Sequence, residues 1–170
     1  MRLGHWTLAL AVLTCLVLHH GGPWHERAGY LALGVALWRT AWGWVARDPF
    51  ARWSHCVRGP GATLAYARAL RRGDEPHHLG HNPLGAWMIL ALLSAALAAA
   101  ASGALYVTDR FWGEAWLSET HEWLGWSLAG LVPLHLAGVV FTSWRQRENL
   151  VAAMLHGHKR APTSLTRTQA

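Results

Sequence analysis

The stretch THEWLGWSLAGLVPLHLAGVVFTSW, residues 120–144, is long and apolar enough to cross a bilayer as one helix. It contains His121 and His135, which are fourteen residues apart. Fourteen helical residues advance about 21 Å and return to within about 40° of the same face. One membrane helix therefore presents two imidazoles on one side, one near each edge of the membrane. This arrangement can hold two haems stacked across a bilayer, and it makes transmembrane electron transfer the leading hypothesis.

The composition of the whole chain fits a membrane protein of one domain. Hydrophobic residues make up 52% of its 170 residues and charged residues 14%, against about 25% charged in average chains. Twelve tryptophans are present, and many lie where an apolar stretch ends, as at membrane interfaces. The net charge of +6 lies in loops rather than on one basic face, which argues against nucleic acid. Cys15 and Cys56 form no C-x-x-C-H motif, so no covalent c-type haem is indicated.

Four apolar stretches predict an all-α, integral membrane four-helix bundle in residues 1–160. The expected spans are listed by residue number: about 3–20, 27–45, 83–107 and 120–144. The first is short, and a signal peptide is the alternative, although no small-residue cleavage site follows it. Asn82 before Pro83 is a candidate N-cap for the third span, and Thr120 for the fourth.

Loop charge predicts the orientation of the spans. The connection 46–82 and the segment after the fourth span are rich in arginine and lysine, whereas the other two connections are mostly acidic. The acidic residues of those connections are Glu26, Asp109, Glu114, Glu119 and Glu122, against Arg27 and Arg110. Both termini and the loop 46–82 are therefore expected to be cytoplasmic. Residues 62–72 can form a helix at the cytoplasmic surface, and the tail 161–170 is expected to be disordered.

Four histidines can pair by depth in this topology. His25 with His121 forms an outer pair, and His5 with His135 forms an inner pair; we keep these two names below. A polar residue inside a membrane is costly and is a functional hypothesis by default. A haem with two imidazole ligands has no open position and is suited to moving electrons. Small residues one turn from the ligands would leave room for a flat ring: they are Gly29, Gly125 and Gly138.

Other polar residues leave alternatives open. Arg39 lies fourteen residues after His25, level with His135, so it can pair with a haem propionate or extend to the cytoplasmic interface. His19 and His20 lie at the exterior end of the first span and are expected at the interface. His81 can meet a quinone, a propionate or water.

Several motifs together resemble the bacterial cytochrome b561 family, which includes the membrane cytochrome b subunits of nickel–iron hydrogenases. They are Arg2-x-x-His5-Trp6, His25-x-x-x-Gly29-Tyr30, Arg39-x-x-Trp42-Gly43, Gly80-His81-Asn82-Pro83-Leu84-Gly85, His121 with His135, Arg147-Glu148-Asn149-Leu150 and Gly157-x-Lys159-Arg160. They cover nearly all of residues 2–160. One departure is the short segment between His5 and His25, which makes the first hairpin shorter than is usual in the family.

The resemblance implies a multi-pass protein of the bacterial inner membrane with two haems b. It implies that His5, His25, His121 and His135 are the axial ligands. It also implies electron transfer between a periplasmic redox partner, a c-type cytochrome or a hydrogenase, and ubiquinone or menaquinone in a respiratory chain. The loop 108–119 is similar to that of members paired with c-type cytochromes. A homo-oligomer is left open.

Two other hypotheses remain. The chain can be a self-contained quinone-dependent oxidoreductase that acts on a small exterior oxidant such as superoxide, which would need a cationic exterior funnel; the exterior loops are net acidic. It can also be a structural anchor or zinc transporter. Zinc sites gather three or four ligands at one depth, and these four histidines divide between two depths.

Overall fold

The computed structural model describes residues 2–47, 52–53, 59–74, 82–146 and 149–156, and in these ranges the chain is helical with no strand. Six helices can be given bounds within the described ranges: α1 (Arg2–Val17), α2 (Pro23–Val45), α4 (Pro60–Arg72), α5 (Pro83–Tyr106), α6 (Ala115–Gln146) and α7 (Leu150–His156). The all-helical class predicted from the sequence is confirmed.

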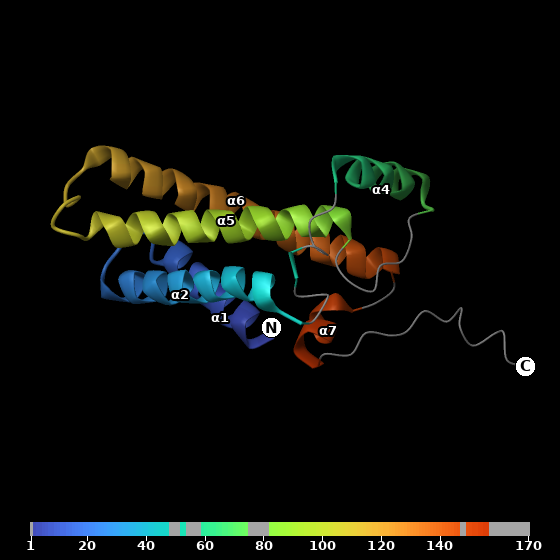
Figure 1. Cartoon of the computed structure of the whole chain (residues 1–170), viewed down its shortest axis with the longest axis horizontal. Coiled ribbons are helices and arrows are strands. Elements are labelled where there is room, and N and C mark those ends of the chain that lie inside the picture. The colour runs from blue at the N-terminus through green and yellow to red at the C-terminus, as the bar shows by residue number, and fades with distance from the viewer. Residues whose placement is uncertain (1, 48–51, 54–58, 75–81, 147–148, 157–170) are drawn as a thin grey trace, which may run out of the picture.

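The long helices pack in series, with α1 on α2, α2 on α5 and α5 on α6 (Figure 1). A small core joins three of them: Ala96 and Ala99 of α5 meet Leu128 of α6, with Val12 and Leu16 of α1 packed against the cluster. The α1–α2 turn and the α5–α6 loop lie at one end of the molecule, and the N-terminus lies beside α7 at the other end. At that second end, Arg2 Nη1 donates to the carbonyl of Leu155 at 2.9 Å.

Local sequence explains where the helices begin. Gly21 and Gly22 have positive φ values of 85° and 99°, so the turn between α1 and α2 is tight, and Pro23 follows at the first helical position. Asn82 caps α5, because its Oδ1 accepts the backbone N–H of Gly85 at 2.7 Å. This cap was predicted from the sequence and is confirmed.

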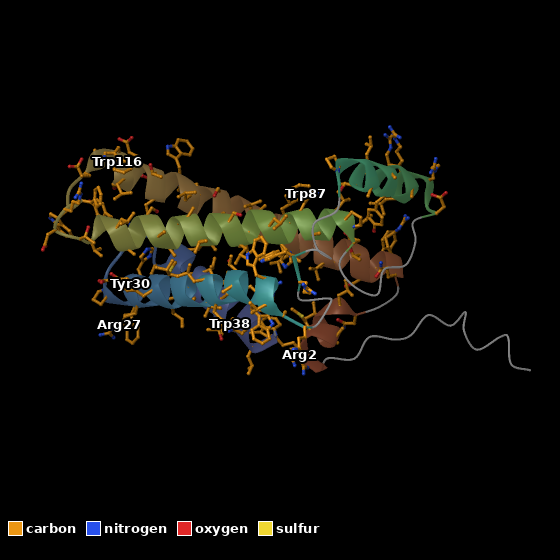
Figure 2. All side chains as sticks on the ribbon, in the orientation of Figure 1. Arg2, Arg27, Tyr30, Trp38, Trp87 and Trp116 are labelled. Atoms are coloured by element: carbon orange, nitrogen blue, oxygen red, sulfur yellow. The ribbon has the colours of Figure 1, made fainter. Side chains whose placement is uncertain are left out.

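Two predicted helix ends are wrong. Helix α6 begins at Ala115 rather than at Thr120, whose hydroxyl instead donates to the carbonyl of Trp116 at 2.7 Å inside the helix. Helix α1 ends at Val17 rather than near His20, because the two glycines reverse the chain. A helix is present where residues 62–72 were predicted to form one, as α4, and its place at the cytoplasmic surface stays a prediction. Trp87 Nε1 of α5 donates to Thr63 Oγ1 of α4 at 3.1 Å; Trp87 is labelled in Figure 2. The predicted disordered tail 161–170 lies outside the described residues.

Small side chains fill the contacts between helices, while large apolar ones face outward. Seven of the eleven buried hydrophobic residues among those described are alanines: Ala11, Ala32, Ala36, Ala46, Ala86, Ala96 and Ala99. Exposed residues include Trp123, Trp126 and Trp144 of α6. Close helix contacts through small residues with an apolar exterior are typical of proteins in lipid.

Within the described residues, α5 and α6 have the length and composition of membrane spans. Helix α1 is apolar but has only 16 residues. Helix α2 has 23 residues, and Arg39 together with its glycines and tryptophans makes it less apolar. Crossing of the membrane by α1 and α2, and hence the four-helix bundle with cytoplasmic termini, stays a prediction.

Candidate functional site

The outer pair is brought together by α2 and α6. His25 lies in the first turn of α2, and His121 lies two turns into α6. The centroids of the two imidazole rings are 5.9 Å apart, and the ring planes are inclined by 75°. Both side chains are half-buried. Residues almost one hundred positions apart in the sequence therefore form one pair of imidazoles.

Both outer histidines have the same protonation pattern, and hydrogen bonds fix it. His25 Nδ1 donates to the carbonyl of Leu18 at 3.0 Å and to that of Cys15 at 3.2 Å, at the end of α1. His121 Nδ1 donates to the carbonyl of Ala99 on α5 at 2.9 Å. Because a carbonyl oxygen can only accept, the proton must be on Nδ1 in both rings. In the neutral form of each ring, Nε2 then carries the lone pair with which an imidazole binds a metal.

The spacing of the outer pair fits a single metal ion held between two imidazoles. Two metal–nitrogen bonds of about 2 Å, with about 1 Å from each nitrogen to its ring centre, would separate the centroids by about 6 Å. The observed centroid separation is 5.9 Å. A carbonyl or carboxylate bonded to the second ring nitrogen is the usual support of a metal-binding histidine. The donor set and spacing of the outer pair therefore fit a bis-imidazole haem iron.

The inner pair is also brought together, but with less support. His5, in the first turn of α1, is close enough to His135 of α6 for the two imidazoles to interact electrostatically. The His5 ring packs edge-on against Trp6, with centroids 5.3 Å apart. Among the described residues neither His5 nor His135 has a hydrogen-bond partner, and His5 is exposed.

A buried donor lies beside the inner pair. The indole Nε1 of Trp6 is buried and has no hydrogen-bond partner among the described residues. A buried N–H without an acceptor costs about 1–3 kcal/mol, so an acceptor is expected there. A carboxylate of a bound haem is an acceptor of suitable chemistry. This unpaired donor, next to His5 in the sequence, fits the inner pair as a second haem site.

The three glycines predicted to leave room for a ring do have open space around them. A Cβ built on Gly29, Gly125 or Gly138 would meet no atom within 4 Å. Gly29 and Gly125 lie one turn after His25 and His121, and Gly138 lies one turn after His135. No neighbouring atom therefore lies next to the Cβ position of these three glycines, and their role beside a haem stays a prediction.

Arg39 has a contact that the sequence did not predict. Its guanidinium lies over the ring of Trp53, 4.9 Å from the centroid, and the side chain is half-buried. Trp53 itself packs against Gly43 and donates its Nε1–H to the carbonyl of Thr40 at 3.0 Å. Trp53 therefore holds the Arg39 charge near the second half of α2. Pairing with a propionate stays a prediction.

Sequence reasoning missed two residues of the outer site. Ser102, which is buried, places its Oγ 3.1 Å from His121 Nδ1, and Gly103 lies directly under the same ring. The only signal was a Ser-Gly pair inside an alanine-rich stretch, AAAASGALY, residues 98–106. That pair gives no indication of function until α5 is placed beside α6.

Other histidines lie apart from these pairs. His19 and His20 are exposed, and their rings contact each other with centroids 3.8 Å apart and planes inclined by 43°. His81 lies outside the described residues. Within the part of the chain that the structure describes, no three His, Cys, Asp or Glu side chains gather as a zinc site requires.

One end of the molecule carries exposed acidic side chains. They are Glu26, Asp109, Glu114, Glu119 and Glu122, from α2, the α5–α6 loop and α6. The two arginines of this end lie over aromatic rings, Arg27 over Trp24 at 5.1 Å and Arg110 over Phe111 at 5.6 Å. Arg27 and Trp116 mark this end in Figure 2. The end is net acidic and also presents exposed tryptophans.

Comparison with known proteins agrees with the family resemblance inferred from the sequence motifs. The family model of prokaryotic cytochrome b561 matches residues 1–157, which is nearly the whole chain. Neither the curated proteins nor the solved structures gave a match.

Proposed function

Because the chain belongs to the prokaryotic cytochrome b561 family, we propose that it moves electrons across a bacterial inner membrane through two bis-histidine haems b. The electrons pass between a periplasmic redox protein, a c-type cytochrome or a hydrogenase, and the membrane quinone pool. Membership itself means a membrane cytochrome b that binds haem b and transfers electrons. The number of haems, the ligands, the sides of the membrane and the partners are our proposal.

The outer pair carries this proposal. Its two rings are 5.9 Å apart, and carbonyls at each Nδ1 keep each Nε2 free for iron. His25, His121, His5 and His135 would hold two haems, with Gly29, Gly125 and Gly138 leaving space beside them. Bound haem supplies a one-electron ferric–ferrous couple. The helices keep the four imidazoles in place, so little rearrangement accompanies electron transfer.

The acidic end supports a protein partner on the outer side. Exposed carboxylates attract a basic docking surface and accelerate its encounter, as electrostatic steering does in general. The same charges repel superoxide and other anions, which weakens the alternative of a self-contained oxidoreductase. We therefore place the docking of a basic redox protein at the end that contains Glu114 and Glu119.

Proteoliposomes test the proposal. The purified protein would be reconstituted with menaquinol or ubiquinol in the membrane and a basic oxidised c-type cytochrome outside. We expect reduction of the external cytochrome that disappears when either His121 or His135 is replaced with Ala. Reduction that persists in both variants would contradict electron transfer through two haems. Consumption of superoxide without any reduction of the cytochrome would favour the oxidoreductase.

A further inference from the structure

The ring of His121 lies against Ser102 and Gly103 of α5. A Cβ built on Gly103 would lie 2.9 Å from His121 Cε1 and 3.2 Å from Nδ1. Real Cβ atoms essentially never come within 3.0 Å of such a neighbour, so any side chain at this position displaces the ring. Glycine at position 103 is therefore a requirement for the observed place of His121.

Ser102 adds a directed hydrogen bond to this contact. Its hydroxyl donates to the carbonyl of Ala99 at 2.9 Å, so its oxygen lone pairs are left for His121 Nδ1 at 3.1 Å. The Nδ1–H is thus shared between two acceptors, Ala99 O and Ser102 Oγ. Two acceptors at an angle restrict rotation of the ring more than one acceptor does. Ser102 is also the one buried polar side chain among the described core residues.

We propose that Ser102 and Gly103 are positioning residues for His121, and that they fix the rotation of this imidazole and the proton on Nδ1. The inference rests on the proposed function, because it concerns His121 as a ligand of the outer haem. It adds that α5, which supplies no ligand, controls the electronic properties of one ligand. An imidazole whose Nδ1–H is hydrogen-bonded is more basic at Nε2 and stabilises ferric iron.

Ser102→Ala tests the hydrogen bond. The variant keeps the Ala99 acceptor, so we expect two haems per chain as in the unmodified protein. We expect the ferric–ferrous equilibrium of the outer haem to move about threefold toward ferrous, because one of two hydrogen bonds at Nδ1 is lost. The low-spin EPR signal of the outer haem should also change, since the ring gains rotational freedom. Ser102→Thr keeps a hydroxyl and should restore both readouts.

Ser127→Ala is the matched control. Ser127 Oγ donates to the carbonyl of Leu124 at 2.7 Å, three residues back, as Ser102 does on α5. Ser127 is exposed, and among the described residues its hydroxyl forms no hydrogen bond with a histidine. We expect the haem potentials and EPR signals of Ser127→Ala to equal those of the unmodified protein. If Ser102→Ala behaves like Ser127→Ala, the proposal for Ser102 is wrong.

Gly103→Ala tests the steric contact independently of Ser102. We expect the outer haem to be lost or its EPR signal to be altered, with the inner haem unchanged. Gly130→Ala is the control, because Gly130 lies on the opposite face of α6 from His121 and a Cβ there meets no atom within 4 Å. An unchanged outer haem in Gly103→Ala would overturn the positioning role of Gly103.

The outcomes separate this proposal from the proposed function. If the unmodified protein lacks an outer haem, or if His121→Ala retains it, the proposed function itself fails. If the unmodified protein holds both haems and His121→Ala loses one, while Ser102→Ala and Gly103→Ala leave the outer haem unchanged, then only the positioning role fails.

Discussion

His25 and His121 lie among backbone carbonyls and a serine hydroxyl, whereas His5 and His135 have no hydrogen-bond partner among the described residues. The two pairs use the same residue type on the same helix, α6, at positions fourteen residues apart. They differ in what surrounds them: His25 donates to the carbonyls of Cys15 and Leu18 at the end of α1, and His121 donates to the carbonyl of Ala99 within α5. His5 of the inner pair lies in the first turn of α1, where the backbone offers donors rather than acceptors.

This difference predicts unequal haem sites. Ligands whose second nitrogen is anchored are held in the binding orientation before the metal arrives, and such support is worth about 10–100-fold in metal affinity. The outer site should therefore bind its haem more tightly and with a more uniform geometry. The inner site should depend more on Trp6, Arg39 and the packing around them.

Removal of one ligand from each pair tests the pairing and gives the largest expected effect. His121→Ala and His25→Ala should each remove the outer haem and leave the inner one, while His135→Ala and His5→Ala should do the reverse. The haem content of each variant, measured by pyridine haemochrome, should fall from two to about one per chain. His20→Ala, an exposed histidine outside both pairs, should keep two haems. If His25→Ala loses the same haem as His135→Ala, the pairing is wrong.

Haem retention tests the difference in anchoring. In the presence of excess apomyoglobin, which captures released haem, we expect the inner haem to leave about tenfold faster than the outer haem or faster still. His135→Ala and His121→Ala, each with a single haem, give the reference spectra that identify which haem is leaving. Faster release of the outer haem would contradict the comparison drawn between the two pairs.

Replacement of Arg39 tests whether its charge affects the potential of the inner haem. A positive charge near the inner haem destabilises ferric iron and raises its potential, so Arg39→Gln should lower the inner potential. One charge at about 10 Å in an effective dielectric near 20 contributes about 1–2 kcal/mol. For a one-electron couple this is about 50–100 mV, since tenfold in the equilibrium constant is about 59 mV.

Arg39→Lys keeps the charge and should leave the inner potential nearly unchanged, while the outer potential should stay constant in both variants. Redox titrations that show no shift, or equal shifts of both haems, would indicate that Arg39 interacts with Trp53 and solvent rather than with the inner haem.

Substitutions at the acidic end test where the redox partner docks, and we expect the smallest effect from them. Glu114→Gln combined with Glu119→Gln should slow electron transfer to a basic c-type cytochrome about threefold at low ionic strength, because these exposed charges act on the encounter rate. Asp74→Asn is the control; Asp74 forms an ion pair with Arg72 at 3.5 Å after α4, near the other end. Equal effects of the two sets of substitutions would contradict docking at the acidic end.

The helices, and the proximity of His25 to His121, could be predicted from the apolar stretches and from the spacing of the histidines. The spacing of fourteen residues predicted that His121 and His135 lie at two depths on one helix. The Asn82-Pro83 pair predicted where α5 begins. The start of α6 was missed because Trp116 and Glu119 resemble interface residues, although the helix already includes them. Polar residues can lie in the first turns of a membrane helix, because water at the interface forms hydrogen bonds with their side chains.

The support around the outer pair could not be predicted. It depends on the carbonyls of Cys15, Leu18 and Ala99, and backbone atoms carry no sequence signal. Ser102 and Gly103 become meaningful only when the ring of His121 from another helix is placed on them. The contact between Trp53 and Arg39 could not be predicted either, because the sequence does not indicate that Trp53 lies against α2.

A haem count with a reduced-minus-oxidised visible spectrum of the purified protein tests the central claim most directly. Our account predicts two non-covalent haems b per chain, both low-spin, with two resolvable potentials. Both should be extracted by acid acetone, since no C-x-x-C-H motif binds them covalently. One haem per chain, or none with zinc in its place, would contradict the account.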